Sequence, residues 1–271
     1  MKLSHILLLT ATAFFGLTAC DNIDEAERFE GPLNNGGGEM PAVQKNVLVE
    51  DFTGQKCANC PKAHEEIEKL QKVYGERIIA VALHGGNMSV DESNKKVLGL
   101  ANEESKAYNN KMGSLGYPKG EIDRVSGLQD FEKWAATVVS RIAMTPQVSV
   151  EVSPVTFDPS SRQLALSSTL KSNANVNGHL QVWLTESNIV ALQTMPNGSV
   201  NKNYVHNHVF RATVNGMEGE ALNLTQAQTV TKDYTYTIPE KWNAENMNIV
   251  AFYYNAADGV IQVVEVPVVN K

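Results

Sequence analysis

Cys57 and Cys60 are separated by two residues, a spacing that is typical of reversible disulfide chemistry. The pair follows an apolar segment and precedes one with helical periodicity, so we expect it at the junction of a strand and a helix. A helix N-terminus presents unpaired N–H groups and a partial positive charge, which lower the pKa of a thiol placed there. We therefore predict that Cys57, beside Lys56, attacks the substrate and that Cys60, one turn on and more buried, resolves the mixed disulfide.

Other roles for this cysteine pair have to be weighed against redox chemistry. A zinc ion needs four ligands, and His64 is the one additional candidate close in sequence. Haem attachment needs a histidine directly after the second cysteine, where this chain has Pro61. We therefore expect no metal and no cofactor at the pair, while a purely structural disulfide stays open as an alternative.

The segments around the pair predict a βαβ unit. Residues 45–52 read as a buried strand, residues 58–74 as a helix with one apolar stripe, and residues 77–84 as a second apolar strand. Such a unit implies two parallel strands. Further on we expect an inserted helical segment over residues 87–112, a single short strand over residues 121–125 and a helix over residues 128–142.

The pattern changes at Met144. Short runs of alternating apolar residues follow one another, separated by turn signals such as Asn177-Gly178, Asn215-Gly216 and Asp258-Gly259. Six to eight strands over about 125 residues are typical of an antiparallel β-sandwich of immunoglobulin-like size. The predicted fold is therefore α/β plus all-β, with one domain over residues 45–143 and another over residues 144–271.

The first half resembles thioredoxin-like proteins in the spacing from Asp51-Phe52 to Cys57 and Cys60. The resemblance implies that Asp51 is a buried acid that assists proton transfer, with Glu50 beside it as a rival for that role. It also implies that Tyr117-Pro118 forms a cis-proline loop, in which Pro118 lies against the cysteines and Tyr117 contacts the substrate. Thr145-Pro146 is the competing candidate for that loop. Thioredoxins have a hairpin after this proline, and a single strand here suggests a trimmed sheet.

Composition and the N-terminal segment indicate where the protein functions. A net charge of −7 argues against a nucleic-acid partner, which would require a basic face. Lys2, a short apolar run and the tetrad Leu17-Thr18-Ala19-Cys20 look like a lipoprotein signal in which Cys20 is acylated, although an ordinary cleaved signal remains the alternative. We predict a signal peptide over residues 1–19 and an acidic, glycine-rich tether over residues 20–44 that holds the protein on the membrane by its lipid.

Taken together, these features resemble a family of Bacteroidota outer-membrane lipoproteins, the twenty-eight-kilodalton outer membrane protein type. The shared features are the lipobox, F-T-G-x-x-C-x-x-C-P, G-Y-P followed by I-D-R, and Y-V-H-N-H-V-F-R at residues 204–211. The resemblance implies a thioredoxin-like fold at the outer membrane, facing either the periplasm or the cell surface, and names no substrate. His206 and His208, two apart on an expected strand, would point to one face, but with no third ligand in sight we interpret them as structural.

The sequence therefore predicts a lipid-anchored, extracytoplasmic thiol–disulfide oxidoreductase whose partners are protein thiols, disulfides or a redox protein. The alternative is a surface binding or adhesion lipoprotein in which the thioredoxin-like part is a scaffold and the cysteines form a structural disulfide. Neither the direction of electron flow nor the substrate can be read from Ala58-Asn59.

Overall fold

The structure is a computed structural model that describes residues 43–113 and 116–270. The predicted signal peptide, the acylation site Cys20 and nearly all of the expected tether lie outside the described residues. Among the helices that are described, none is long and apolar enough to cross a membrane.

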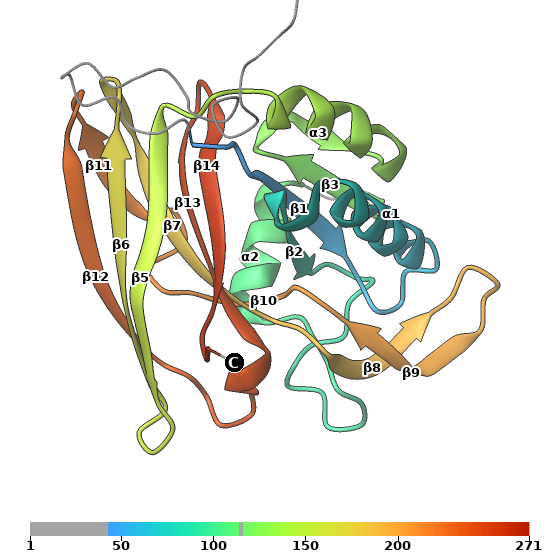
Figure 1. The fold of residues 1–271 in the computed structure, drawn as a ribbon. Coiled ribbons are helices and arrows are strands. Elements are labelled where there is room, and N and C mark those ends of the chain that lie inside the picture. The colour runs from blue at the N-terminus through green and yellow to red at the C-terminus, as the bar shows by residue number, and fades with distance from the viewer. Residues whose placement is uncertain (1–42, 114–115, 271) are drawn as a thin grey trace, which may run out of the picture. The chain divides into compact units, whose positions relative to one another are not determined.

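Three helices and fourteen strands make up the described chain (Figure 1). The helices are α1 (Cys60–Tyr74), α2 (Glu103–Lys111) and α3 (Trp134–Ile142). The first strands are β1 (Val47–Thr53), β2 (Ile78–His84), β3 (Lys119–Ile122) and β4 (Val125–Gln129). The later strands are β5 (Val148–Asp158), β6 (Gln163–Ser172), β7 (Val176–Glu186), β8 (Ile189–Thr194), β9 (Val200–His206), β10 (Val209–Thr213), β11 (Glu220–Leu224), β12 (Thr229–Thr237), β13 (Met247–Asn255) and β14 (Gly259–Pro267).

The predicted βαβ unit is present, with β1 and β2 parallel and α1 between them. Alternate residues of β1 enter two different cores, because successive side chains of a strand point to opposite faces. Val47 and Val49 pack against α1 and α3, whereas Leu48 and Phe52 pack with α2 and Trp183 on the other face. The uninterrupted apolar runs of both strands follow from this two-sided burial.

Three local predictions in the first half are wrong. A hairpin of β3 and β4 follows Pro118, where we expected one strand over residues 121–125 and a trimmed sheet. Strand β4 occupies the start of the expected helix over residues 128–142, so α3 begins at Trp134 after a 3-10 turn, η3 (Phe131–Lys133). In the expected helical insert, α2 alone is helical, because the stretch before it carries polar turn residues that fold as a loop.

One sheet runs through both halves of the chain, in the order β14-β13-β7-β10-β2-β1-β3-β4, with β11 paired to β7. Strand β10 pairs parallel to β2 on one side and antiparallel to β7 on the other. The border that we expected between residues 143 and 144 therefore does not separate two independent sheets, and contacts group the described chain as one unit.

The protein is mostly β, as expected for its second half, and several sheets are present. Strands β12, β6 and β5 form a three-stranded sheet whose buried residues pack on β7 and β13 around Leu166, Leu180 and Ile249. Strands β8 and β9 form a separate hairpin. In Figure 1 this hairpin extends on the side of α1 and β1, away from the three-stranded sheet.

The I-D-R segment at residues 122–124 connects the first half of the chain to the second. Asp123 and Arg124 both adopt positive φ angles, 49° and 55°, at the tight turn between β3 and β4. The Asp123 side chain is fully buried, and its main-chain carbonyl accepts a hydrogen bond from the amide of Val260 in β14. This turn therefore joins the first half of the chain to its last strand.

Candidate disulfide site and histidine cavity

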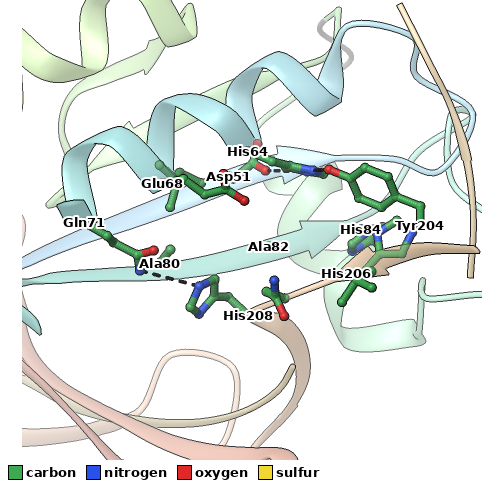
Figure 2. A pocket seen from close by; sticks show the side chains of 13 residues that line it. Asp51, His64, Glu68, Gln71, Ala80, Ala82, His84, Tyr204, His206 and His208 are labelled. Atoms are coloured by element: carbon green, nitrogen blue, oxygen red, sulfur yellow. Dashed lines mark hydrogen bonds and ion pairs between the residues drawn. The ribbon is translucent and has the colours of Figure 1, made fainter. Parts of the chain in front are cut away.

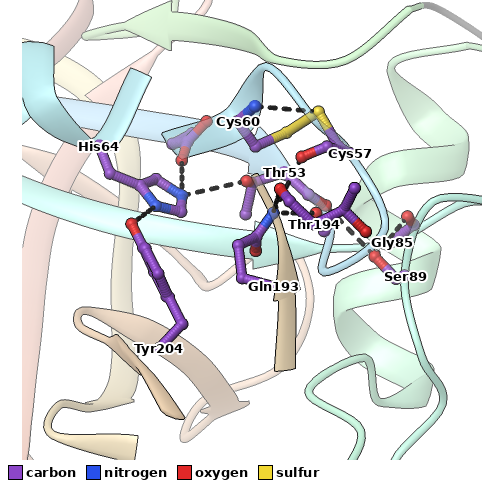
Figure 3. Close-up of a disulfide and its surroundings, with 11 residues drawn as sticks. Thr53, Cys57, Cys60, His64, Gly85, Ser89, Gln193, Thr194 and Tyr204 are labelled. Carbon is purple, nitrogen blue, oxygen red and sulfur yellow. Dashed lines mark hydrogen bonds and ion pairs between the residues drawn. A yellow bond between two sulfur atoms is a disulfide. The ribbon is translucent and has the colours of Figure 1, made fainter. Parts of the chain in front are cut away.

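Cys57 and Cys60 form a disulfide between the end of β1 and the start of α1, with their Cα atoms 5.4 Å apart. Helix α1 begins at Cys60, and the amide of Cys60 donates a hydrogen bond to Sγ of Cys57 at 3.1 Å (Figure 3). A first-turn N–H, which has no partner within the helix, is thus directed at the sulfur that we predict to attack. The same N–H would stabilise a Cys57 thiolate after reduction.

Both cysteines are covered. Cys60 is fully buried and Cys57 is only 4% exposed, so the expected difference in burial between them is small. The hairpin of β8 and β9 contributes to this cover, because Nε2 of Gln193 donates to the carbonyl of Cys57 at 2.9 Å and the amide of Thr194 donates to the carbonyl of Gln55 at 2.8 Å. Gly54 allows a close approach on another side, since a Cβ there would lie 2.6 Å from the carbonyl oxygen of Met88.

Asp51 lies in β1 with its side chain fully buried, where the resemblance placed a buried acid. Among the described residues, neither carboxylate oxygen has a hydrogen-bond partner, although Oδ2 lies 3.4 Å from Nε2 of His64. Burial raises the pKa of Asp51, and the nearby His64 opposes this shift. Glu50, the rival, points to the opposite face and makes two 3.0 Å contacts with the guanidinium of Arg124, so it is engaged in an ion pair.

An Asp51→Asn variant is expected to become more stable than the wild type as pH rises. Below the ordinary aspartate pKa of 3.8 the carboxyl is protonated in both states, and the two proteins should differ little. Above it, the unfolded chain loses the proton more readily than the folded protein, whose Asp51 pKa is raised, so wild-type stability falls as pH rises through the folded pKa. Urea unfolding from pH 4 to pH 8 measures this difference. The exposed Glu240→Gln variant is the control, and an advantage of Asp51→Asn that does not grow with pH would contradict the assignment.

The groups that face Asp51 across a shared cavity are titratable as well. They are His64 and Glu68 of α1, His84 of β2, Tyr204 and His206 of β9, and His208 just beyond β9.

The Tyr117–Pro118 peptide bond is cis, as the resemblance implied. Thr145–Pro146, the competing candidate, is not among the cis bonds of the described residues. Pro118 and Tyr117 line a cavity of about 420 Å³ together with Asn59 and Lys62 at the start of α1. The hydroxyl of Tyr117 donates to Oδ1 of Asn109 at 2.6 Å, so its tip is held by α2.

His206 and His208 do not lie on one strand, so that prediction is wrong. Strand β9 ends at His206, His208 has a φ angle of 56°, and β10 begins at Val209. Even so, both rings line the cavity of about 80 Å³ that contains Asp51, His64 and His84 (Figure 2). Burial lowers the pKa of both His206 and His208 to about 4 and lowers that of His84 as well, so these three rings are neutral at neutral pH. In the part of the chain that the structure describes, no group of three His, Cys, Asp or Glu side chains could hold a metal ion.

Sequence reasoning missed three residues of this region. His64 was considered only as a zinc ligand, although its position four residues after Cys60 places both on one helix face. Gln193 had no local signal, and Tyr204 was noted only as part of the Y-V-H-N-H-V-F-R motif, because their hairpin reaches the disulfide only through tertiary packing. Tyr204 donates or accepts a hydrogen bond at 2.8 Å between its hydroxyl and Nδ1 of His64.

Comparisons with known proteins place the chain in a family. A family model described as outer membrane protein Omp28 matches residues 105–271, well over half of the chain and excluding the cysteine pair. Among solved structures, HBP35 of Porphyromonas gingivalis is similar with a TM-score of 0.63 and 18% identity over 83% of this chain and 75% of that chain.

Two further findings complete the comparison. A domain of the outer membrane lipoprotein Omp28 from Porphyromonas gingivalis is 24% identical over 45% of this chain and 88% of that chain, with a TM-score of 0.31. No curated protein matches. The similarity to HBP35 concerns the fold, whereas the family model identifies the chain. This protein therefore belongs to the Omp28 family of outer membrane proteins, in agreement with the outer-membrane location predicted from its sequence.

Proposed function

We propose that this protein is a thiol–disulfide oxidoreductase of the outer membrane, anchored through a lipid on Cys20, and that Cys57 and Cys60 exchange with protein thiols or disulfides. The β1–α1–β2 unit and the following hairpin would then be a thioredoxin-like part, and the later strands an immunoglobulin-like sandwich that docks substrates or partners. The observation that carries the proposal is the position of the disulfide at the N-terminus of α1, where the amide of Cys60 donates to Sγ of Cys57.

Two further features support redox chemistry. Asp51 is a fully buried acid on the strand that leads into the disulfide, and burial raises its pKa, as suits a group that takes up and releases protons during exchange. The cavity between Pro118 and the start of α1 gives a substrate segment room beside the cysteines. Tyr117 and Pro118 would position that segment.

A second candidate function is a binding lipoprotein in which the disulfide is structural. The low exposure of Cys57 and its cover by Gln193 favour this alternative, because a catalytic thiol has to be reached by its substrate. In that case the disulfide would only stabilise the start of α1.

Trapping with a Cys60→Ala variant distinguishes the two functions. If Cys57 attacks substrates, the variant should accumulate mixed disulfides, because the resolving thiol is missing. In the wild type, Cys57 should be alkylated before Cys60 at mildly acidic pH after reduction, and the reduction potential should lie at about −120 to −270 mV. Mass spectrometry of the full-length protein in detergent measures the mixed disulfides and the order of alkylation, and equilibration in redox buffers gives the potential.

The matched control is a Cys57→Ala variant, which keeps Cys60 in its buried position and should trap nothing. A potential below about −300 mV, combined with equal absence of mixed disulfides in both variants, would leave the structural disulfide as the better account.

A further inference from the structure

His64 has the most connected position in the histidine cavity. It projects from α1 one turn after Cys60, and Figure 3 shows its ring in contact with Thr53 on one side and Tyr204 on the other. Its Nε2 atom lies 3.4 Å from Oδ2 of Asp51 and 3.2 Å from Oγ1 of Thr53. Its Nδ1 atom lies 2.8 Å from the hydroxyl of Tyr204. One ring therefore bridges the buried acid of β1 and the hairpin strand β9.

Contact with Asp51 and exposure together distinguish His64 in this cavity. Glu68, Tyr204 and His208 also reach solvent, but the His64 ring is the one whose nitrogen lies within 4 Å of the Asp51 carboxylate among the described residues. Asp51 is completely buried, whereas 18% of the His64 side chain is exposed. His84 and His206 are buried, and their lowered pKa values keep them neutral. His64 is therefore the imidazole that touches Asp51 on one side and reaches solvent on the other.

Disulfide exchange at this site requires such a proton. When a substrate thiolate attacks Sγ of Cys57, the S–S bond breaks and its electron pair leaves on Cys60, which is fully buried. A thiolate in a buried position is costly unless it is protonated, so a proton has to be supplied from inside the protein. The resemblance to thioredoxin-like proteins assigns this proton to Asp51, which is buried on the strand leading into the disulfide and whose pKa burial raises.

We propose that His64 is the proton-positioning residue of the disulfide site, which carries protons between solvent and Asp51 during each exchange. The inference rests on the proposed redox function and adds a residue to it. In the first step, Asp51 gives its proton to the Cys60 thiolate and becomes a carboxylate. His64 then returns a proton to Asp51 and takes one from solvent.

The second step completes the exchange. The remaining thiolate of the substrate dithiol attacks the mixed disulfide and releases Cys57, so the substrate is oxidised by two electrons to its disulfide and the protein pair becomes a dithiol. The two substrate thiols release their protons to solvent. The protein takes up two protons, one at Cys60 by way of His64 and Asp51 and one at Cys57. The reverse sequence reduces a substrate disulfide.

A single-turnover reaction of the full-length oxidised protein with dithiothreitol tests the role of His64. A His64→Ala variant should react about 10²-fold more slowly or worse at neutral pH, because a positioned proton-transfer group typically contributes 10²–10⁴-fold. Imidazole added to the buffer should restore part of the rate, since the ring site is partly open to solvent. The pH profile of the rate should also change shape.

A second variant separates proton transfer from structural support. As the control, His179→Ala removes a histidine of β7 that does not line the cavity, so its rate and pH profile should stay close to the wild type. His64→Gln keeps a side chain that can hydrogen-bond but cannot carry a proton, and should be as slow as His64→Ala. If both His64 variants react at the wild-type rate, or if imidazole restores nothing, the relay is refuted.

The experiment also distinguishes failure of the relay from failure of the redox function. A wild-type disulfide that dithiothreitol reduces only after unfolding would contradict the redox function itself. A wild type that reacts in the folded state, together with His64 variants that react equally fast, would contradict the relay alone.

Discussion

An Asp123→Asn variant is expected to lose about 3–5 kcal/mol of its free energy of unfolding, the usual cost of leaving a buried charge without its partner. Oδ2 of Asp123 contacts both Nζ of Lys45 and Nε of Arg141 at 2.8 Å, and Oδ1 accepts the amide of Leu48 at 2.9 Å. Removing the carboxylate leaves two buried cations facing each other. Urea unfolding measures the loss.

The loss at Asp123 should depend on pH. Burial already lowers the pKa of Lys45 to about 8 while Asp123 supports the charged form, so without Asp123 the Lys45 pKa falls further. At high pH the Lys45 side chain of the variant is neutral and does not repel Arg141. At pH 6 a larger fraction of the variant molecules carries a charged Lys45. The variant should therefore lose more stability at pH 6 than at pH 9.

The control for Asp123 is Asp130→Asn, which removes the exposed partner of Lys119. Exposed pairs contribute little, so this variant should be far less affected. Equal losses in the two variants would contradict the role of Asp123 as the charge that balances Lys45 and Arg141.

An Arg124→Ala variant is expected to lose a similar amount, about 3–5 kcal/mol, because it leaves Glu50 buried without its cation. The guanidinium carbon of Arg124 also lies 4.5 Å from the ring centre of Tyr254 and 4.8 Å from that of Phe252. Arg124 thus connects β1 to β13 through charge on one side and aromatic rings on the other. Thermal and urea unfolding report the loss.

Two variants separate these contributions of Arg124. Arg124→Lys keeps the charge but not the two parallel contacts to Glu50, so it should fall between the wild type and alanine. Adding Glu50→Gln to Arg124→Ala should recover part of the stability, since the buried anion is gone. A double variant that is no more stable than Arg124→Ala would contradict the charge argument.

The site was predictable from the sequence where the signals were local. The apolar run before Cys57, the helical stripe after Cys60 and the spacing from Asp51 are short-range patterns, and the structure has the corresponding strand, helix and buried acid. The cis bond at Tyr117–Pro118 followed from the same resemblance. The roles of these residues in catalysis stay predictions.

The rest of the site depends on long-range packing. Gln193 and Tyr204 reach Cys57 and His64 because β8 and β9 fold as a hairpin beside α1, and no local pattern shows where a hairpin will dock. The hairpin of β3 and β4 was missed because its turn contains Asp123 and Arg124 at positive φ angles, which ordinary turn signals do not indicate. Asp123 and Arg124 form buried ion pairs, which explains why this turn has these residues and not glycine.

The pairing of β10 with β2 also determines when the first half can fold. Ala82 pairs with Val209, so the middle of the large sheet stays incomplete until more than two hundred residues have been synthesised, and β13 and β14 come later still. Pairings this distant in sequence make folding slow, because the chain has to close long loops before it gains contacts. For a protein that leaves the cytoplasm on its way to the outer membrane, slow completion of the sheet favours export of an unfolded chain, and the Cys57–Cys60 disulfide is covered only after β8 with Gln193 has arrived.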